Sequence, residues 1–199
     1  QMSLIGLKEI SLIKTPPPNR QSISTYICLE EDDLIKNAIQ KEINRGGQVF
    51  VVNNNVRDLE SILLKIQAMV PEARTSIAHG QMPERLLEKT ILEFYKGNAQ
   101  ILIATTIVES GIDIPNANTM IVLNSDKYGL SQLHQLRGRI GRSERKAFVY
   151  FTVKSHSISE IASKRLKALQ RFSDLGAGFS IANSDLEIRG AGNIIGGDQ

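Results

Sequence analysis

The chain has 199 residues, of which 41% are hydrophobic and 23% are charged, and its formal net charge is +3. One cysteine and three histidines exclude an internal disulfide framework and a metal-ligand cluster. No apolar run reaches the eighteen or so residues of a membrane span, and the first residues lack a secretory signal pattern, so we expect a soluble protein of the reducing cytoplasm with no membrane partner.

Residues 1–20 predict a linker. Three consecutive prolines, Pro16 to Pro18, favour an extended segment with few backbone hydrogen bonds. We expect this segment to connect to a first lobe that the chain does not contain.

After the linker, short apolar runs alternate with amphipathic stretches that have helical spacing. This alternation predicts βαβ units and a parallel sheet with helices on both faces, an α/β fold. The predicted strands are 23–29, 48–54, 75–80, 100–106, 119–124 and 147–153, and the helices between the first four lie in 33–47, 56–71 and 83–98.

Ligands of such sheets bind beyond the carboxyl ends of the strands. Polar residues follow several predicted strands: Asn53 to Asn55, His79 with Gly80, and Thr105 with Thr106. An arginine-rich segment, Arg137 to Arg142, lies in a connection between two strands. We expect all four groups to meet at one edge of the sheet.

The pattern changes near the end of the chain. Residues 157–175 predict one amphipathic helix, and the remainder contains six of the fifteen glycines. We therefore predict three parts: the linker 1–20, an α/β lobe 21–155 and a helical appendage 156–199.

The segment QLHQLRGRIGR, Gln132 to Arg142, contains three arginines and two glycines. Arginine presents a rigid fork of donors that fits phosphate oxygens, and glycine allows a close backbone approach. These residues predict a clamp for a phosphate in a transferring group. The alternative from the residues alone is a solvated basic surface.

The segment ATTIVESGIDIP, 104–115, places two threonine hydroxyls at a strand end, where they can bond a phosphate of a nucleic-acid backbone. Asp113 can accept a hydrogen bond from a ribose hydroxyl or orient an arginine. The alternative is a simple turn in which Asp113 caps a helix.

Together, these two segments resemble motifs VI and V of superfamily 2 helicases. VFVVNNN, Val49 to Asn55, resembles motif IV, and AHGQM, 78–82, resembles the short motif between them. The resemblance implies a RecA-like second helicase lobe. The blocks GIDIPNANT, YGLSQLHQLRGRIGRS, DLGAGF and DLEIRGAGNIIG resemble the transcription-repair coupling factor family (Mfd) more closely than its RecG-type relatives. In both families the appendage is a helical-hairpin translocation motif.

The resemblance implies roles for individual residues at the nucleotide site. Arg142 would contact the γ-phosphate of ATP, with Arg139 beside it and Gln135 positioning the site. Gly111 and Asp113 would couple that site to the DNA groove.

The residues implied to face DNA phosphates are Thr105, Thr106, Asn53, Asn54 and Asn55. Arg189 and Gln199 would lie in the translocation hairpin. The implied partners are double-stranded DNA, the first helicase lobe, and, through regions outside this chain, RNA polymerase and excision-repair proteins.

The sequence contains no GxxxxGK[ST] loop and no acidic box after an apolar strand. In this family ATP and Mg²⁺ are bound mainly by the first lobe. We therefore expect an ATP-dependent DNA translocase activity in the full-length protein and only background ATP hydrolysis by this chain. The alternatives are the equivalent lobe of a RecG-type fork-remodelling helicase, or a non-catalytic DNA-binding module.

Four residues keep open roles at this point. Arg137 could form a structural ion pair, and His134 could serve in packing or capping. His79 could be a site residue or a hydrogen-bonded loop residue. Cys28 is expected to be a small buried apolar residue and not a reactive thiol.

Overall fold

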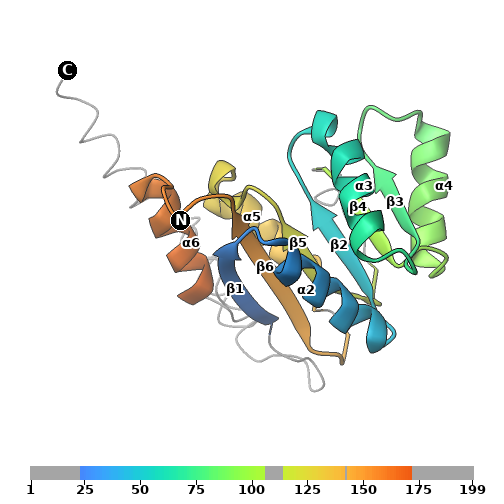
Figure 1. Cartoon of the computed structure of the whole chain (residues 1–199), viewed down its shortest axis with the longest axis horizontal. Coiled ribbons are helices and arrows are strands. Elements are labelled where there is room, and N and C mark those ends of the chain that lie inside the picture. The colour runs from blue at the N-terminus through green and yellow to red at the C-terminus, as the bar shows by residue number, and fades with distance from the viewer. Residues whose placement is uncertain (1–22, 106–113, 142, 172–199) are drawn as a thin grey trace, which may run out of the picture.

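The computed structural model describes residues 23–105, 114–141 and 143–171. In these residues, six parallel strands form one sheet in the order β1-β6-β5-β2-β4-β3, which runs across Figure 1 from one side to the other. The strands are β1 (Ile23–Leu29), β2 (Gln48–Val52), β3 (Thr75–Ala78), β4 (Ile101–Ala104), β5 (Ala117–Val122) and β6 (Ala147–Val153). All six predicted strands are therefore confirmed, with ends that differ by up to two residues.

Helices cover both faces of the sheet. The helices are α2 (Asp32–Asn44), α3 (Leu59–Met69), α4 (Glu84–Tyr95), α5 (Leu130–Arg137) and α6 (Glu160–Arg171), with short 3₁₀ turns η1 (Val56–Asp58) and η3 (Ser125–Lys127). The predicted helices 33–47, 56–71 and 83–98 correspond to α2, α3 and α4. No helix in the described ranges is both long and apolar enough to span a membrane.

The core has two layers, one on each face of the sheet. On one face, Ile39 of α2 and Ile66 of α3 pack against strand residues such as Val51. On the other, Leu133 of α5 and Leu166 of α6 pack with strand residues on the opposite side. Because both faces are buried, the central strands read as continuous apolar runs, which is the pattern that predicted a parallel sheet.

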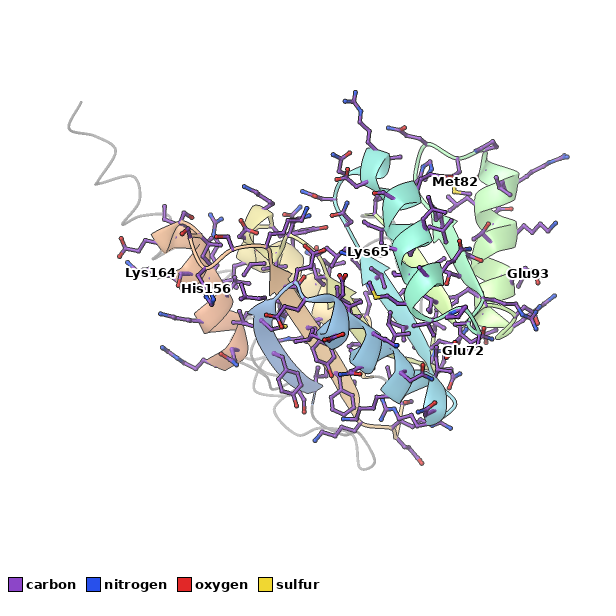
Figure 2. The ribbon with its side chains drawn as sticks, viewed as in Figure 1. Lys65, Glu72, Met82, Glu93, His156 and Lys164 are labelled. Carbon is purple, nitrogen blue, oxygen red and sulfur yellow. The ribbon has the colours of Figure 1, made fainter. Side chains whose placement is uncertain are left out.

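Between α2 and α3, an ion pair adds a surface contact to this packing. Lys65 Nζ lies 2.8 Å from Asp32 Oδ1, and both side chains are exposed (Figure 2). Such an exposed pair contributes at most about 1 kcal/mol, so the apolar layer beneath determines the position of the helices.

Helix α6 belongs to the same core as the sheet. Leu166 and Leu169 are buried in the cluster that also contains α5. The predicted division of the chain at residue 156 stays a prediction, and the rest of the appendage, residues 172–199, lies outside the described residues.

Candidate functional site

The loops after β2, β4 and β5 meet at the carboxyl edge of the sheet. The backbone N–H of Asn53 donates to the carbonyl of Ala104 at 3.0 Å, and Asn124 Nδ2 donates to Asn53 Oδ1 at 3.1 Å. Thr105 follows Ala104 directly and is buried. These contacts bring Asn53 next to Thr105, and Asn55 lies in the same loop as Asn53.

Within the Asn53–Asn55 loop, the side chains have different exposure. Asn53 is fully buried, and its Nδ2 donates to the carbonyl of Asn55 at 3.2 Å. Asn55 Oδ1 accepts from the backbone N–H of Arg57 at 3.0 Å, while the side chains of Asn54 and Asn55 are exposed. Asn53 thus shapes the loop from beneath, and Asn54 and Asn55 are the residues that it presents to solvent.

Asn124 is a residue of this edge that sequence reasoning missed. Its backbone φ is +51°, the left-handed region that asparagine tolerates better than most residues. That conformation lets the chain turn at the end of β5 while the side chain reaches Asn53. The sequence signal was an Asn directly after an apolar strand and before a Ser-Asp pair.

His79 lies at the outer end of the same edge, after β3. The ring Nδ1 of His79 accepts a hydrogen bond from the backbone N–H of Gln81 at 3.2 Å, and the backbone N–H of His79 donates to Met82 Sδ at 3.3 Å. Figure 2 labels Met82 beside α4. These contacts fit the open alternative of a hydrogen-bonded loop histidine.

The arginine-rich segment lies at the opposite edge. Gly141 packs so closely on Ile23 and Ala147, the first residues of β1 and β6, that a Cβ there would lie 2.8 Å from Ile23 Cγ1. Ser143 Oγ donates to Asn118 Oδ1 near the start of β5 at 3.2 Å. The prediction that this segment meets the other groups at one edge is therefore wrong. The reason is that α5 starts near the carboxyl end of β5 and carries the chain back to the amino end of β6.

Helix α5 separates the roles of the side chains within this segment. Leu130, Leu133 and Leu136 are fully buried and anchor the helix, whereas Gln135 is exposed. Arg139 follows the helix and is half-buried. The buried leucines therefore fix the position of Gln135 and of the chain that leads to Arg139.

Arg137 points into the protein. It is 3% exposed, and its Nη1 donates to the carbonyl of Leu169 at 2.6 Å and to Thr25 Oγ1 at 3.4 Å. It thereby connects α5 with β1 and with the last turn of α6, where a cation also interacts favourably with the helix dipole. Of the alternatives for Arg137, the structural role is the one that these contacts support.

His134 and Cys28 have shifted pKa values. Burial, helped by the charge of Arg137, lowers the pKa of His134 to about 4, so the ring is neutral near pH 7 and its Nδ1 can accept from Arg137 Nη2 at 3.3 Å. Burial, with a smaller contribution from Glu31, raises the pKa of the Cys28 thiol to about 11. A thiol that stays protonated is a poor nucleophile, as expected for Cys28.

Six predicted site residues lie outside the described residues: Thr106, Gly111, Asp113, Arg142, Arg189 and Gln199. The ends of the segment that contains Gly111 and Asp113 are nevertheless placed. Thr105 follows β4 at the carboxyl edge, and Ile114 lies before β5, which begins at the amino edge.

Comparison with known proteins identifies the lobe. Residues 31–144 match the family model described as the helicase conserved C-terminal domain. The chain belongs to this family. The predicted RecA-like fold of a superfamily 2 helicase C-terminal lobe is confirmed by this match, by the six-stranded parallel sheet and by the similarity to RecG given below.

Two relatives that match this chain over its whole length have a more specific name than the family model. Over all 199 residues, the chain is 51% identical to a transcription-repair-coupling factor of Myxococcus xanthus and 48% identical to that of Bacillus subtilis (strain 168), and it spans 17% of the length of each. A structure of RecG bound to a three-way DNA junction superposes with a TM-score of 0.71 at 32% identity, over 85% of this chain and 22% of that chain.

Proposed function

We propose that this chain is the second motor lobe of an ATP-dependent double-stranded DNA translocase that displaces stalled RNA polymerase and couples transcription to nucleotide excision repair in the cytoplasm. The observation that carries the proposal is the 51% identity, over the entire chain, to a protein named transcription-repair-coupling factor. RNA polymerase and excision-repair proteins would bind regions outside this chain.

The nucleotide side of the proposal rests on the amino-edge loop after α5. Arg142 would contact the γ-phosphate of ATP, with Arg139 beside it and Gln135 positioning the site. Guanidinium groups are donors that stay charged, so they fit phosphate oxygens and not a metal ion. Mg²⁺ neutralises charge on the phosphates in such sites, and its ligands belong by resemblance to the first lobe.

The DNA side of the proposal rests on the carboxyl edge. Asn54 and Asn55 are exposed there and, with Thr106, would contact DNA phosphates, while the buried Asn53 and Thr105 would support this surface from beneath. Gly111 and Asp113 would couple ATP hydrolysis to DNA movement. The described residues before and after them support this role, because Thr105 follows β4 at the carboxyl edge and Ile114 precedes β5, which begins at the amino edge.

Two further parts of the proposal concern the translocation hairpin and the ATP hydrolysis of this chain alone. Arg189 and Gln199 would act in a translocation hairpin that transmits lobe motion to DNA. Because the phosphate-binding loop would come from the first lobe, we expect this chain alone to hydrolyse ATP only at background rate, even with DNA present.

The test uses the full-length parent protein and RNA polymerase stalled on a DNA template. We expect ATP-dependent displacement of the polymerase, and its loss in an Arg142→Ala variant. Remodelling of a branched fork without displacement would instead assign the RecG-type function, which the RecG similarity makes the second candidate. DNA binding without either activity would indicate a non-catalytic module.

A further inference from the structure

Glu42 is a buried carboxylate that the proposed function does not use. It is 1% exposed, in the last turns of α2, and it accepts hydrogen bonds from Arg45 and from Thr119 Oγ1 of β5 at 3.1 Å. Gly47 leaves room for it, since a Cβ there would lie 2.7 Å from the Glu42 carboxyl carbon. Burying a carboxylate costs several kcal/mol unless it is paired, and an apolar residue would fill the same space at lower cost.

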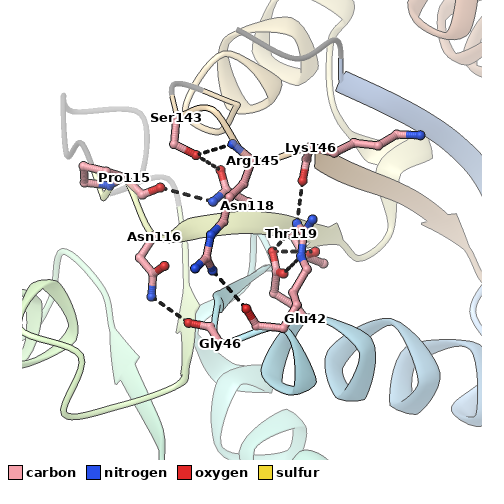
Figure 3. A network of polar contacts seen from close by, with 10 residues as sticks. Glu42, Gly46, Pro115, Asn116, Asn118, Thr119, Ser143, Arg145 and Lys146 are labelled. Carbon is pink, nitrogen blue, oxygen red and sulfur yellow. Dashed lines mark hydrogen bonds and ion pairs between the residues drawn. The ribbon is translucent and has the colours of Figure 1, made fainter. Parts of the chain in front are cut away.

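The guanidinium that pairs with Glu42 also holds the segment after the predicted arginine finger. Arg45 Nη2 donates to the carbonyl of Lys146, one hundred and one positions further along the chain. In return, Arg145 Nη1 donates to the carbonyl of Arg45 at 3.0 Å. Figure 3 shows these reciprocal contacts between the end of α2 and residues 143–146.

A second set of contacts joins the same segment to the residues that follow Asp113. Ser143 Oγ donates to Asn118 Oδ1, and Asn118 Nδ2 donates to the carbonyl of Pro115 at 3.1 Å. Asn116 Nδ2 donates to the carbonyl of Gly46 at 3.1 Å (Figure 3). The segments that follow motifs V and VI are therefore tied to each other and to the end of α2.

These contacts anchor the chain on both sides of Arg142. On one side, Gly141 is packed against Ile23 and Ala147. On the other side, Ser143, Arg145 and Lys146 are held by the contacts of Figure 3. An arginine that must reach a phosphate in another lobe benefits from a backbone fixed at both neighbours, because a displacement of about 1 Å can lower a rate by about a hundredfold.

We propose that Glu42 and Arg45 are positioning residues for the arginines of motif VI. We call their contacts with Thr119 and Lys146, together with the Ser143–Asn118 hydrogen bond, the α2 brace. The brace rests on the proposed function, because it positions Arg139 and Arg142 for ATP hydrolysis. It acts through the backbone of residues 143–146 and touches no nucleotide.

The experiment compares variants of the full-length parent protein in DNA-stimulated ATP hydrolysis. Arg45→Met leaves the buried carboxylate without its cation, so it lowers both stability and kcat. The double variant Glu42→Gln with Arg45→Met removes the buried charges but keeps an oxygen for Thr119. Its melting temperature and DNA affinity should therefore return close to wild type.

The kcat of the double variant distinguishes a positioning role of Glu42 and Arg45 from a role in stability alone. The hydrogen bond from Arg45 to the carbonyl of Lys146 is then lost, so we expect kcat to stay about tenfold below wild type despite the recovered stability. Recovery of kcat together with the melting temperature would overturn the proposal. Lys36→Ala, an exposed cation on the same helix, serves as the matched control and should leave kcat unchanged.

Two further measurements keep the outcomes distinct. If the double variant does not fold, we test Ser143→Ala, which removes the contact with Asn118 and the hydrogen bond that Ser143 Oγ accepts from the backbone N–H of Arg145. It should lower kcat with little change in the melting temperature, and wild-type kcat would overturn the proposal. Arg142→Ala is measured in parallel. If the Arg142→Ala protein retains ATP turnover, the proposed function itself is wrong. If Arg142→Ala abolishes ATP turnover but the brace variants have normal kcat, only the proposed role of the brace is wrong.

Discussion

Arg137 Nη1 donates a 2.6 Å hydrogen bond to the carbonyl of Leu169, so the first arginine of the RGRIGR segment is bonded to α6 and not directed at a ligand. The contact joins residues 32 positions apart and lies in the core beside β1. The contacts of Arg137 therefore fit a structural role within the lobe.

We expect Arg137→Met to lower the free energy of unfolding by about 2–3 kcal/mol, the range for a buried hydrogen bond from a charged group. Arg137→Lys should recover part of this loss, since an ammonium can reach only one of the acceptors. Urea unfolding of the three proteins measures the effect. If the Met variant were as stable as wild type, the hydrogen bonds of Arg137 would not contribute to the stability of the lobe.

His134 should make the lobe sensitive to mild acid. The pKa of His134 is lowered from 6.5 to about 4 in the folded lobe, chiefly by burial. Below pH 6.5 the unfolded chain binds a proton that the folded lobe does not, so the free energy of unfolding falls as the pH drops from about 6.5 to about 4. Above pH 6.5 the histidine contributes no pH dependence.

The variant His134→Gln isolates this effect, because its Oε1 can still accept from Arg137 and it does not titrate. We expect its stability to fall less than that of wild type between pH 7 and pH 5. Denaturant unfolding at both values provides the comparison, and the carboxylates common to both proteins cancel. Identical pH dependence would show that the His134 proton is not excluded by folding.

Gly141 should be intolerant of any side chain for two reasons. Its φ is +75°, and a Cβ would lie 2.8 Å from Ile23 Cγ1. Gly141→Ala should cost about 1–2 kcal/mol for the left-handed backbone and a further 1–3 kcal/mol or so for overpacking. In the parent protein it should also lower kcat, because it displaces the backbone next to Arg142.

Gly97 offers the matched control for this substitution. Its φ is +83°, but no atom lies within 4 Å of a Cβ placed there. Gly97→Ala should therefore cost only the backbone term of about 1–2 kcal/mol and leave kcat unchanged. Equal destabilisation by the two alanines would mean that the contact of Gly141 with Ile23 is not tight.

Asn124 should support the DNA-facing loop from behind. Asn124→Gly keeps the φ of +51° accessible but loses the hydrogen bond to Asn53, whereas Asn124→Ala loses both. We expect both variants to bind duplex DNA about two- to fivefold more weakly, as for one lost hydrogen bond. Both variants should be less stable than wild type because they leave the buried Asn53 Oδ1 without this donor, and the alanine should be less stable than the glycine by a further 1–2 kcal/mol or so.

Fluorescence anisotropy with the parent protein and labelled duplex measures the affinity, and thermal unfolding measures the stability. If the glycine variant binds DNA as tightly as wild type, the contact between Asn124 and Asn53 does not shape the DNA surface. That result would leave the exposed Asn54 and Asn55 as independent contacts.

The fold could be predicted from sequence because its signal is local. Runs such as Val49 to Val52 are apolar at every position, since both faces of a central parallel strand are buried. The glycine stops and the helical spacing of α2, α3 and α4 are local in the same way. Tertiary context was needed mainly for the exact ends of these elements.

The site was predicted less completely, because its geometry depends on chain direction and burial. The eight-residue helix α5 reverses the chain and places Gly141 at the amino edge, which residue spacing did not reveal. Arg137 ends α5 and is buried, whereas Arg139 follows the helix and is half-buried, a difference that depends on tertiary packing. Glu42 did leave a signal, a charge in the apolar stripe of α2 after Ile35 and Ile39. Its distant partner Thr119, and the carbonyl of Lys146 that accepts from Arg45, come close to it only in the folded lobe.

The most direct test of the proposed motor function is the DNA-stimulated ATP turnover of the full-length parent protein carrying Arg142→Ala. The matched control is Arg85→Ala, an exposed arginine on α4. We expect Arg142→Ala to lower kcat by about a thousandfold or more, the effect of removing an arginine finger, with duplex DNA affinity retained and Arg85→Ala normal. Normal turnover by the Arg142→Ala protein would contradict the assignment of this lobe as the arginine-donating half of the motor.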